Sequence, residues 1–190
     1  LRNFLRRQND LGRTAWNTPE VRYGFQAWWI QKLREQCPGA WEEVVAAENR
    51  HPPMTLRVNR RKTTLEDYLP VLARAGIESR SLGGMAVRID PRPVAEIPGF
   101  GEGLASVQDA GAQWAARLLD VVDGQRVLDA CAAPGGKTGH LLELADLDLL
   151  ALDNDPARLG RITENLDRLG LHARVACADA GRPDEWWDGR

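Results

Sequence analysis

The sequence is poor in the residues and patterns that mark several specialised classes of protein. It has three cysteines, widely spaced and odd in number, which argues against a disulfide framework and favours a reducing cytoplasm. These cysteines form no metal-ligand spacing, so we expect no metal site. No apolar run is long enough to span a membrane, and the N-terminus lacks the continuous apolar segment of a secretory signal.

The net charge is also small, because 25 basic residues are balanced by 27 acidic ones. This balance does not by itself indicate nucleic-acid binding, so any affinity for RNA must come from local basic patches. The 190 residues, 43% of them hydrophobic, suit one or two globular domains.

The most informative segment is VLDACAAPGGKTGHLLE, which runs from Val127 to Glu143. Val127 and Leu128 predict the end of a buried strand, and Lys137 and Thr138 open a helix. The residues between them have little bulk, so backbone N–H groups can approach a ligand closely. The helix N-terminus supplies further unpaired N–H groups. We therefore expect a nucleotide-binding loop.

Two phosphate-binding motifs compete for this loop. The letters GGKT suggest a P-loop that uses Lys137, but that motif requires glycine where Cys131 stands. A dinucleotide fold requires G-x-G-x-x-G, and only the adjacent pair Gly135–Gly136 is present. An ordinary βα turn would not explain why consecutive loop positions up to Gly136 are all Ala, Cys, Pro or Gly.

From residue 124 onward the pattern alternates between strand and helix. We expect strands over 126–129, 149–153 and 173–177, and helices over 136–145 and 156–169. Asp155 caps the second helix and Gly170 closes it. Alternation of this kind predicts a parallel sheet with right-handed crossovers, whose ligands bind beyond the C-terminal ends of the strands. The outer edge of the first strand is expected to be unpaired.

Three aspartates, Asp129, Asp153 and Asp179, fall at or just beyond these strand ends. Asp153 stands where nucleotide folds place an acid against ribose hydroxyls, and a carboxylate can accept from two hydroxyls at once. Asp129 is expected to brace the loop. Arg158, in the turn after Asp153, is a weaker candidate that could equally be solvated. The alternative for all three acids, Asp179 included, is that they are solubilising loop residues.

The loop fits an S-adenosylmethionine loop of Rossmann-like methyltransferases, and the form ACAAPGGKT closely resembles the first motif of RNA cytosine-5 methyltransferases. Within them it is most similar to the bacterial 16S rRNA enzymes of the RsmB (Sun, Fmu) type. LRNFLRR, PPMTLRVNR and LASVQD also resemble segments of that family. The resemblance implies that Asp153 binds the ribose and Asp179 the adenine amino group of S-adenosylmethionine. It implies a cofactor loop of Cys131, Ala132, Ala133, Pro134, Gly135, Gly136 and Lys137.

The resemblance further implies methylation of C5 of a cytosine in 16S rRNA by a longer parent protein in the cytoplasm. A tRNA enzyme is the alternative, because tRNA enzymes share the loop. In that family one cysteine attacks the base and a second stands in an Asp-Ala-Pro-Cys motif, and this chain contains neither. We assign no catalytic role to Cys131 or to Cys177, which we expect to be buried. The chain is expected to be catalytically silent, and a fragment that only binds RNA is a further alternative.

The fold class that follows is α/β: the first half of a Rossmann-like methyltransferase sheet (residues 109–190), preceded by a small α+β module (52–108) and a helical segment (1–51). The helical segment resembles the end of a NusB-like domain. There we expect helices over 1–8, from Pro19 to about Cys37, and over 40–50. In the module we expect strands over 55–59, 77–81 and 85–89. A helix begins at a capping box formed by Thr63 and Glu66 and runs to Gly76, with Pro70 able to shorten or kink it.

Two groups of residues are candidates for contact with RNA, each of which could instead be an ordinary solvated or packing surface. One is aromatic and basic: Arg2, Arg6, Arg7, Arg13, Trp16, Trp28, Trp29 and Trp41. The other is the densest basic patch of the chain: Arg57, Arg60, Arg61 and Lys62. Such a patch would neutralise phosphates without reading sequence. Gln108 and Asp109 could lie near the mouth of the active site, although a plain capping role suits Asp109 equally well.

Overall fold

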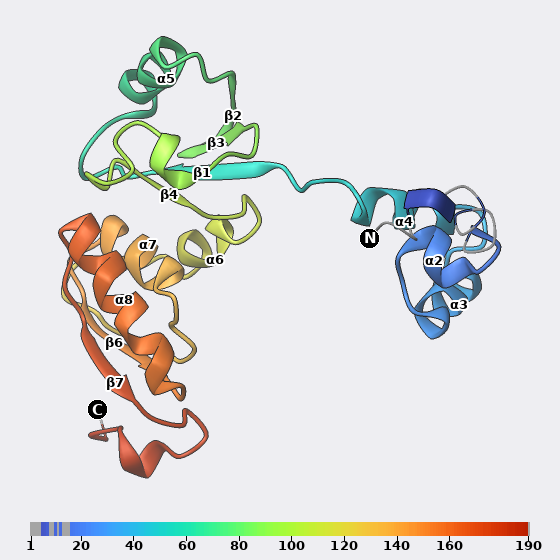
Figure 1. Ribbon diagram of the computed structural model, residues 1–190. Helices are drawn as coiled ribbons and strands as arrows, with labels where there is room; N and C mark the ends of the chain where they lie inside the picture. Colours follow the sequence, from blue (N-terminus) through green and yellow to red (C-terminus); the bar gives the residue numbers. More distant parts are fainter. Residues whose placement is uncertain (1–4, 8–9, 11, 13–15, 190) are drawn as a thin grey trace. The chain divides into compact units, whose positions relative to one another are not determined.

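The computed structural model describes residues 5–7, 10, 12 and 16–189 (Figure 1). It divides into two compact units, Leu1–Pro52 and Pro53–Arg190. The helix expected over residues 1–8 is described only at residues 5–7, which are helical. Arg2 and Arg13 lie outside the described residues, so the RNA-contacting surface that includes them stays a prediction.

The first unit contains α2 (Pro19–Tyr23), α3 (Ala27–Gln36) and α4 (Trp41–Glu48). The prediction of one continuous helix from Pro19 to about Cys37 is wrong. Gly24 adopts a left-handed conformation, with φ of 73°, and ends α2. Gln26 is extended and precedes α3. The glycine thus breaks the helical pattern that the flanking apolar residues suggested.

A middle module opens the second unit. Its strands are β1 (Met54–Val58), β2 (Ser79–Gly83), β3 (Ala86–Ile89) and β4 (Ala105–Val107), which form an antiparallel sheet in the order β2-β3-β1-β4. Helix α5 (Leu65–Arg74) packs on one face of this sheet, and the short helix η1 (Val94–Glu96) follows β3. The core between α5 and the sheet is apolar and includes Leu56, Val58, Tyr68, Leu72, Val87 and Ile89.

Helix α5 begins one residue later than the predicted capping box requires. The N-cap is Thr64, whose Oγ1 accepts a hydrogen bond from the Asp67 N–H at 3.1 Å. The assignment of the cap to Thr63 is therefore wrong. The helix continues through Pro70, because buried Tyr68 and Leu72 hold it against the sheet on both sides of the proline. It ends at Arg74.

The rest of the second unit is an α/β half, running from α6 (Gln113–Leu118) to β7. It contains β5 (Arg126–Asp129), α7 (Gly136–Leu144), β6 (Asp148–Asp153), α8 (Pro156–Leu169), β7 (Arg174–Cys177) and the short helix η2 (Pro183–Glu185). The strands are parallel in the order β5-β6-β7. The predicted β-α-β-α-β pattern is confirmed. Asp155 caps α8 by accepting from the Ala157 N–H, and Gly170 ends it with φ of 70°.

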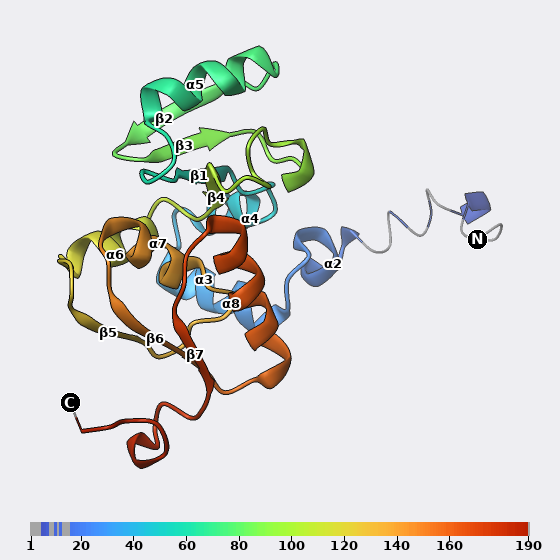
Figure 2. The ribbon, with the colours of Figure 1, turned by 90° about the vertical axis from the view of Figure 1, so that its left-hand side faces the viewer.

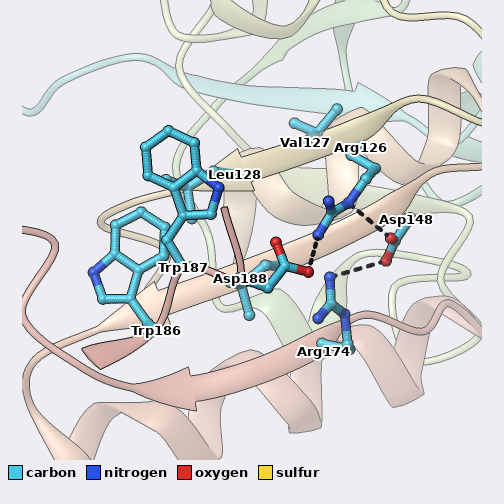
Figure 3. A pocket seen from close by; sticks show the side chains of 9 residues that line it. Arg126, Val127, Leu128, Asp148, Arg174, Trp186, Trp187 and Asp188 are labelled. Atoms are coloured by element: carbon cyan, nitrogen blue, oxygen red, sulfur yellow. Dashed lines mark hydrogen bonds and ion pairs between the residues drawn. The ribbon is translucent and has the colours of Figure 1, made fainter. Parts of the chain in front are cut away.

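The two faces of the parallel sheet differ. One face packs against α7 and α8 through Leu149, Ala151 and their neighbours. On the other face Leu128 and Leu150 line a cavity of about 250 Å³ beside Trp186 and Trp187. Figure 3 shows the two indole rings at this cavity. Arg126 forms ion pairs with both Asp148 and Asp188, and Arg174 forms one with the same Asp148.

Within the described residues β5 pairs with β6 alone, so its outer edge is unpaired, as expected.

Helix α5 lies on one face of the antiparallel sheet, and the helices of the α/β half lie on the other. Both views show this layering (Figures 1 and 2). Because strand residues alternate between faces, β1 sends Leu56 and Val58 into the apolar core and Arg57 towards the α/β half. Strand β1 is therefore buried on both sides, by an apolar layer and by a polar one.

Candidate cofactor site

Arg57 is the main connection between the middle module and α7. Its side chain is 1% exposed, and Glu143 on α7 is 2% exposed. Nε and Nη2 donate to the two carboxylate oxygens of Glu143 at 2.8 and 2.7 Å, which makes a bidentate pair. Nη1 donates to Gln108 Oε1 at 2.6 Å and to the Gly136 carbonyl at 2.9 Å. Burial raises the pKa of Glu143, and Arg57 opposes that shift. Arg57 thus contacts both the first residue and the last turn of α7.

The expectation that Arg57 belongs to an exposed basic patch is wrong. It lies on the polar face of β1, between buried Thr55 and buried Asn59. The strand alternation in the sequence was the signal that could have separated Arg57 from its exposed neighbour Arg60. Arg61 forms an ion pair with Asp146 at 2.7 Å.

Arg168 makes the reverse connection, from α8 to the module. Its Nη1 donates to the carbonyls of Phe100 at 2.6 Å and Ala105 at 3.0 Å, and Nη2 donates to Ser106 Oγ at 2.9 Å. The guanidinium also lies 4.2 Å from the centre of the Phe100 ring. Two arginines inserted in opposite directions therefore fix the module against the helices that carry the candidate loop.

The loop after β5 meets the C-terminal end of β6. The Ala132 N–H donates to the Leu152 carbonyl at 2.8 Å. Asp153 is 2% exposed, and its Oδ2 accepts from the Ala133 N–H at 3.0 Å. Its Oδ1 accepts from the Asp155 N–H at 3.2 Å. The acid that the sequence placed near this loop therefore bonds directly to the loop backbone.

The pKa of Asp153 is lowered from its ordinary value. Donation from the Asp155 N–H is the largest cause, and the Ala133 N–H and the positive charge of Arg158 add to it, while burial opposes it. Arg158 also donates from Nη2 to the Ala133 carbonyl at 2.8 Å. Arg158, which the sequence left open as a solvated residue, is therefore a second support of the loop.

Asp129 was expected to brace the loop, and its side chain bonds to the first turn of α7, directly after the loop. Its Oδ2 accepts from the hydroxyl of Thr138 at 2.7 Å, and Thr138 is fully buried. Asp129 thus ties the end of β5 to the first turn of the helix. The exposed residues of the loop are Cys131, Pro134 and Lys137, whereas Ala132, Ala133 and Gly135 are buried.

The two glycines of the loop serve different purposes. Gly135 has φ of 95°, a conformation that favours glycine, and an added Cβ there would make a tight contact of 3.3 Å with Ile162 Cα on α8. At Gly136 φ is ordinary, and an added Cβ would meet nothing within 4 Å. No internal contact explains a glycine at 136, whereas close approach of a ligand to the backbone would. The loop therefore fits a nucleotide-like cofactor such as S-adenosylmethionine.

Asp179 follows the next strand end. Its neighbour Ala178 donates from its N–H to the Asp153 carbonyl at 3.2 Å, which places Asp179 at the same edge of the sheet. The side chain is 59% exposed, and its Oδ1 accepts from the Gly181 N–H at 2.9 Å. Cys177, expected to be buried, is exposed. It is the last residue of β7, which in the part of the chain that the structure describes pairs with β6 alone.

Other expectations concern the approach to the loop. Gln108 is buried and accepts from Arg57, and Asp109 accepts from the N–H groups of Gly111 and Ala112, which is a capping role. Over the described part of the chain, no group of three His, Cys, Asp or Glu side chains could hold a metal ion. In the same residues no helix has the length and apolar character needed to cross a bilayer.

Two family models match the chain, one from α3 of the first unit into the middle module and one over the α/β half. A family model described as the ferredoxin-like domain of RsmF/B-like methyltransferases matches residues 25–94. A second, described as 16S rRNA methyltransferase RsmB/F, matches residues 116–190. The crystal structure of a methyltransferase homolog protein from Pyrococcus horikoshii has a TM-score of 0.75 and 26% identity, over 87% of this chain and 57% of that one.

Curated relatives match the chain along its whole length. The ribosomal RNA small subunit methyltransferase B of Serratia proteamaculans is 45% identical over 190 residues, which cover 98% of this chain. The protein of the same name from Pseudomonas syringae pv. tomato is 46% identical over 196 residues, which cover all of it. The chain spans 44% of the length of each of these relatives. Both family models, the curated relatives and the fold agree, and the chain belongs to the RsmB family of S-adenosylmethionine-dependent 16S rRNA methyltransferases.

Proposed function

We propose that this chain binds S-adenosylmethionine at residues 131–137, with Asp153 at the ribose hydroxyls and Asp179 at the adenine amino group. The observation that carries the proposal is the hydrogen bond from the Ala133 N–H to Asp153, which joins the loop to the acid at the C-terminal edge of the sheet. When bound, this cofactor supplies an electrophilic methyl group. The loop backbone and the two acids would bind and orient it.

The carboxylate of Asp153 keeps the capacity that this role needs. Each of its oxygens accepts one backbone hydrogen bond, and each carboxylate oxygen has two acceptor positions. Its lowered pKa keeps it ionised, and therefore an acceptor only, at neutral pH. The ribose offers two adjacent hydroxyl donors for this carboxylate, beside Arg158 Nη1, which lies 3.7 Å from Oδ1.

We propose further that the whole protein methylates C5 of a cytosine in 16S rRNA in the cytoplasm. The names of the relatives and the description of the second family model support the choice of rRNA. The 190 residues by themselves are expected to be silent in methyl transfer, because they include no Asp-Ala-Pro-Cys motif. We also propose that the chain consists of three parts: a helical segment (1–51), a small α+β module (52–108) and the first half of the methyltransferase domain (109–190).

Calorimetric titration with S-adenosylhomocysteine, the product form of the cofactor, tests the binding proposal. The wild-type chain should bind it and should not bind Mg-ATP. Asp153→Asn removes one acceptor oxygen and the charge, so the affinity should fall at least about tenfold, which is about 1.4 kcal/mol. Asp167→Asn, an exposed aspartate on α8, is the matched control and should leave binding unchanged.

Two results would contradict the proposal. One is binding of Mg-ATP without binding of S-adenosylhomocysteine, which would assign the loop to phosphate. The other is equal affinity of the Asp153→Asn variant and the wild type. A separate incubation of the chain with 16S rRNA and methyl-labelled cofactor tests its silence, and robust labelling of the RNA would refute it.

A further inference from the structure

A polar cavity of about 360 Å³ lies between the middle module and helices α6 and α7. It shares no residue with the cofactor loop or with Asp153 and Asp179. Its charged walls come from four elements: Arg60 in the turn after β1, Glu66 on α5, Arg117 on α6 and Glu143 on α7. The proposed cofactor role does not involve this cavity.

The charges around the cavity do not cancel. Glu143 is neutralised by its bidentate pair with Arg57. Across the described residues, neither Arg60 nor Arg117 forms an ion pair, and neither does Glu66. Two guanidinium groups thus face one carboxylate, which leaves one positive charge in excess. This excess favours a singly charged anion.

His140 lines the same wall of the cavity. The residue is 5% exposed, and its Nδ1 has no hydrogen-bond partner. Burial is the main reason that the pKa of His140 falls to about 3, and the positive charges of Arg57 and Arg117 lower it further. The imidazole is therefore neutral at physiological pH and can donate one hydrogen bond. Because Nδ1 is enclosed by the protein, Nε2 is the nitrogen left to donate to a ligand in the cavity.

The guanidinium of Arg117 is held in place by the protein. A Cβ added at Gly84 would lie 2.7 Å from Arg117 Nη1, so the side chain packs directly against the turn between β2 and β3. The same guanidinium lies 5.1 Å from the centre of the Trp114 ring. A cation positioned in this way loses less conformational entropy on binding a ligand.

We propose that this cavity binds one phosphodiester group of the RNA substrate, with Arg60 and Arg117 as the cationic contacts and His140 as a neutral hydrogen-bond donor. The inference rests on the proposed function in that the substrate is RNA. A phosphodiester carries a single negative charge, which matches the excess in the cavity, and arginine suits its oxygens. Such a contact positions RNA without reading its sequence.

The cavity and the candidate cofactor loop are both connected to α7. His140 lies on α7, and the first residue of α7 belongs to the cofactor loop. Arg57 ties the module to both ends of that helix. A phosphate held in the cavity would therefore lie at a fixed distance from the loop, because both are built on one helix.

Salt-dependent binding of a 16S rRNA transcript to the full chain tests the proposal. Arg60→Gln and Arg117→Gln should each weaken binding several-fold and lower the slope of log K against log salt by about 1. Glu66→Gln should tighten binding, because it removes the opposing charge. Arg80→Gln, which removes an exposed arginine of β2 outside the cavity, should change neither value. Unchanged slopes for both arginine variants, or weaker binding by Glu66→Gln, would overturn the inference.

NMR of labelled histidine separates RNA from a free anion. The His140 signal, assigned with the His140→Gln variant, should shift when a short RNA is added. A shift with inorganic phosphate but not with RNA would assign the cavity to small anions and overturn the RNA proposal. If the chain binds S-adenosylhomocysteine but no RNA, this inference fails while the cofactor site stands. If the chain binds RNA with the expected salt slopes but does not bind S-adenosylhomocysteine, the phosphate cavity stands and the proposed cofactor site fails.

Discussion

Replacing Arg57 by methionine should be one of the most damaging single changes in the second unit. The variant removes four hydrogen bonds and leaves the Glu143 carboxylate, only 2% exposed, without its partner. Breaking a buried pair by removing one member typically costs about 3–5 kcal/mol. Since domains are stable by about 5–15 kcal/mol, Arg57→Met should keep the fold but lose a large part of its free energy of unfolding.

Urea unfolding followed by tryptophan fluorescence measures this loss. The double variant Arg57→Met, Glu143→Met is the matched control, because it leaves no unpaired charge. Replacement of a buried pair by apolar residues is often nearly neutral. Here Gln108 and the Gly136 carbonyl each lose a donor, so we expect the double variant to lie about 2 kcal/mol below wild type and above the single variant. The stability of Arg57→Lys, which cannot make the bidentate pair, should lie between those of the double variant and Arg57→Met.

The pH dependence gives the prediction a second signature. Burial raises the pKa of Glu143, and removing Arg57 should raise it further. The folded variant then binds a proton that the unfolded chain releases. Its stability should be highest below the ordinary glutamate pKa of about 4.3 and should fall as the pH rises through the raised value. A cost below about 1 kcal/mol at neutral pH, or a double variant no more stable than Arg57→Met, would refute the reasoning.

Three further substitutions test separate parts of the structure. His140→Gln removes a group whose pKa is lowered from 6.5 to about 3. As the pH falls through that range, the free energy of unfolding of wild type should therefore drop by up to about 1.4 kcal/mol per pH unit more than that of the variant. Urea unfolding at several pH values measures this, and an equal pH dependence of the two proteins would contradict it. Thr64→Ala removes the acceptor for the Asp67 N–H and should cost about 1 kcal/mol in urea unfolding, with Thr63→Ala as the near-neutral control. Gly103→Ala combines φ of 74° with a Cβ 2.5 Å from the Arg168 carbonyl oxygen, so it should lower stability by about 2–3 kcal/mol in thermal unfolding, and an unchanged melting temperature would show that the backbone can adjust.

The α/β half could be predicted closely because its signals are local. Strand 126–129 and helix 156–169 were predicted with the bounds that the structure has. The helix is marked at both ends, by an aspartate cap with proline and by a left-handed glycine. In the first unit the glycine at 24 stood inside an apolar pattern, and periodicity alone could not show that it ends a helix.

Contacts between distant segments could not be predicted. Arg57 lies 86 residues from Glu143, and nothing in the sequence near either residue indicates the other. The basic neighbours of Arg57 suggested an exposed patch, and only the polar residues alternating along β1 pointed to a buried face. The contact of Arg158 with the Ala133 carbonyl depends in the same way on how α8 lies beside the loop.

A nitrogen–proton NMR titration of the chain with S-adenosylhomocysteine tests the central claim most directly. The amide signals of residues 131–137, and those next to Asp153, should shift with one common dissociation constant. Binding that leaves these amides unchanged, or that shifts only residues around the cavity between the module and α7, would contradict the assignment of the loop as the cofactor site.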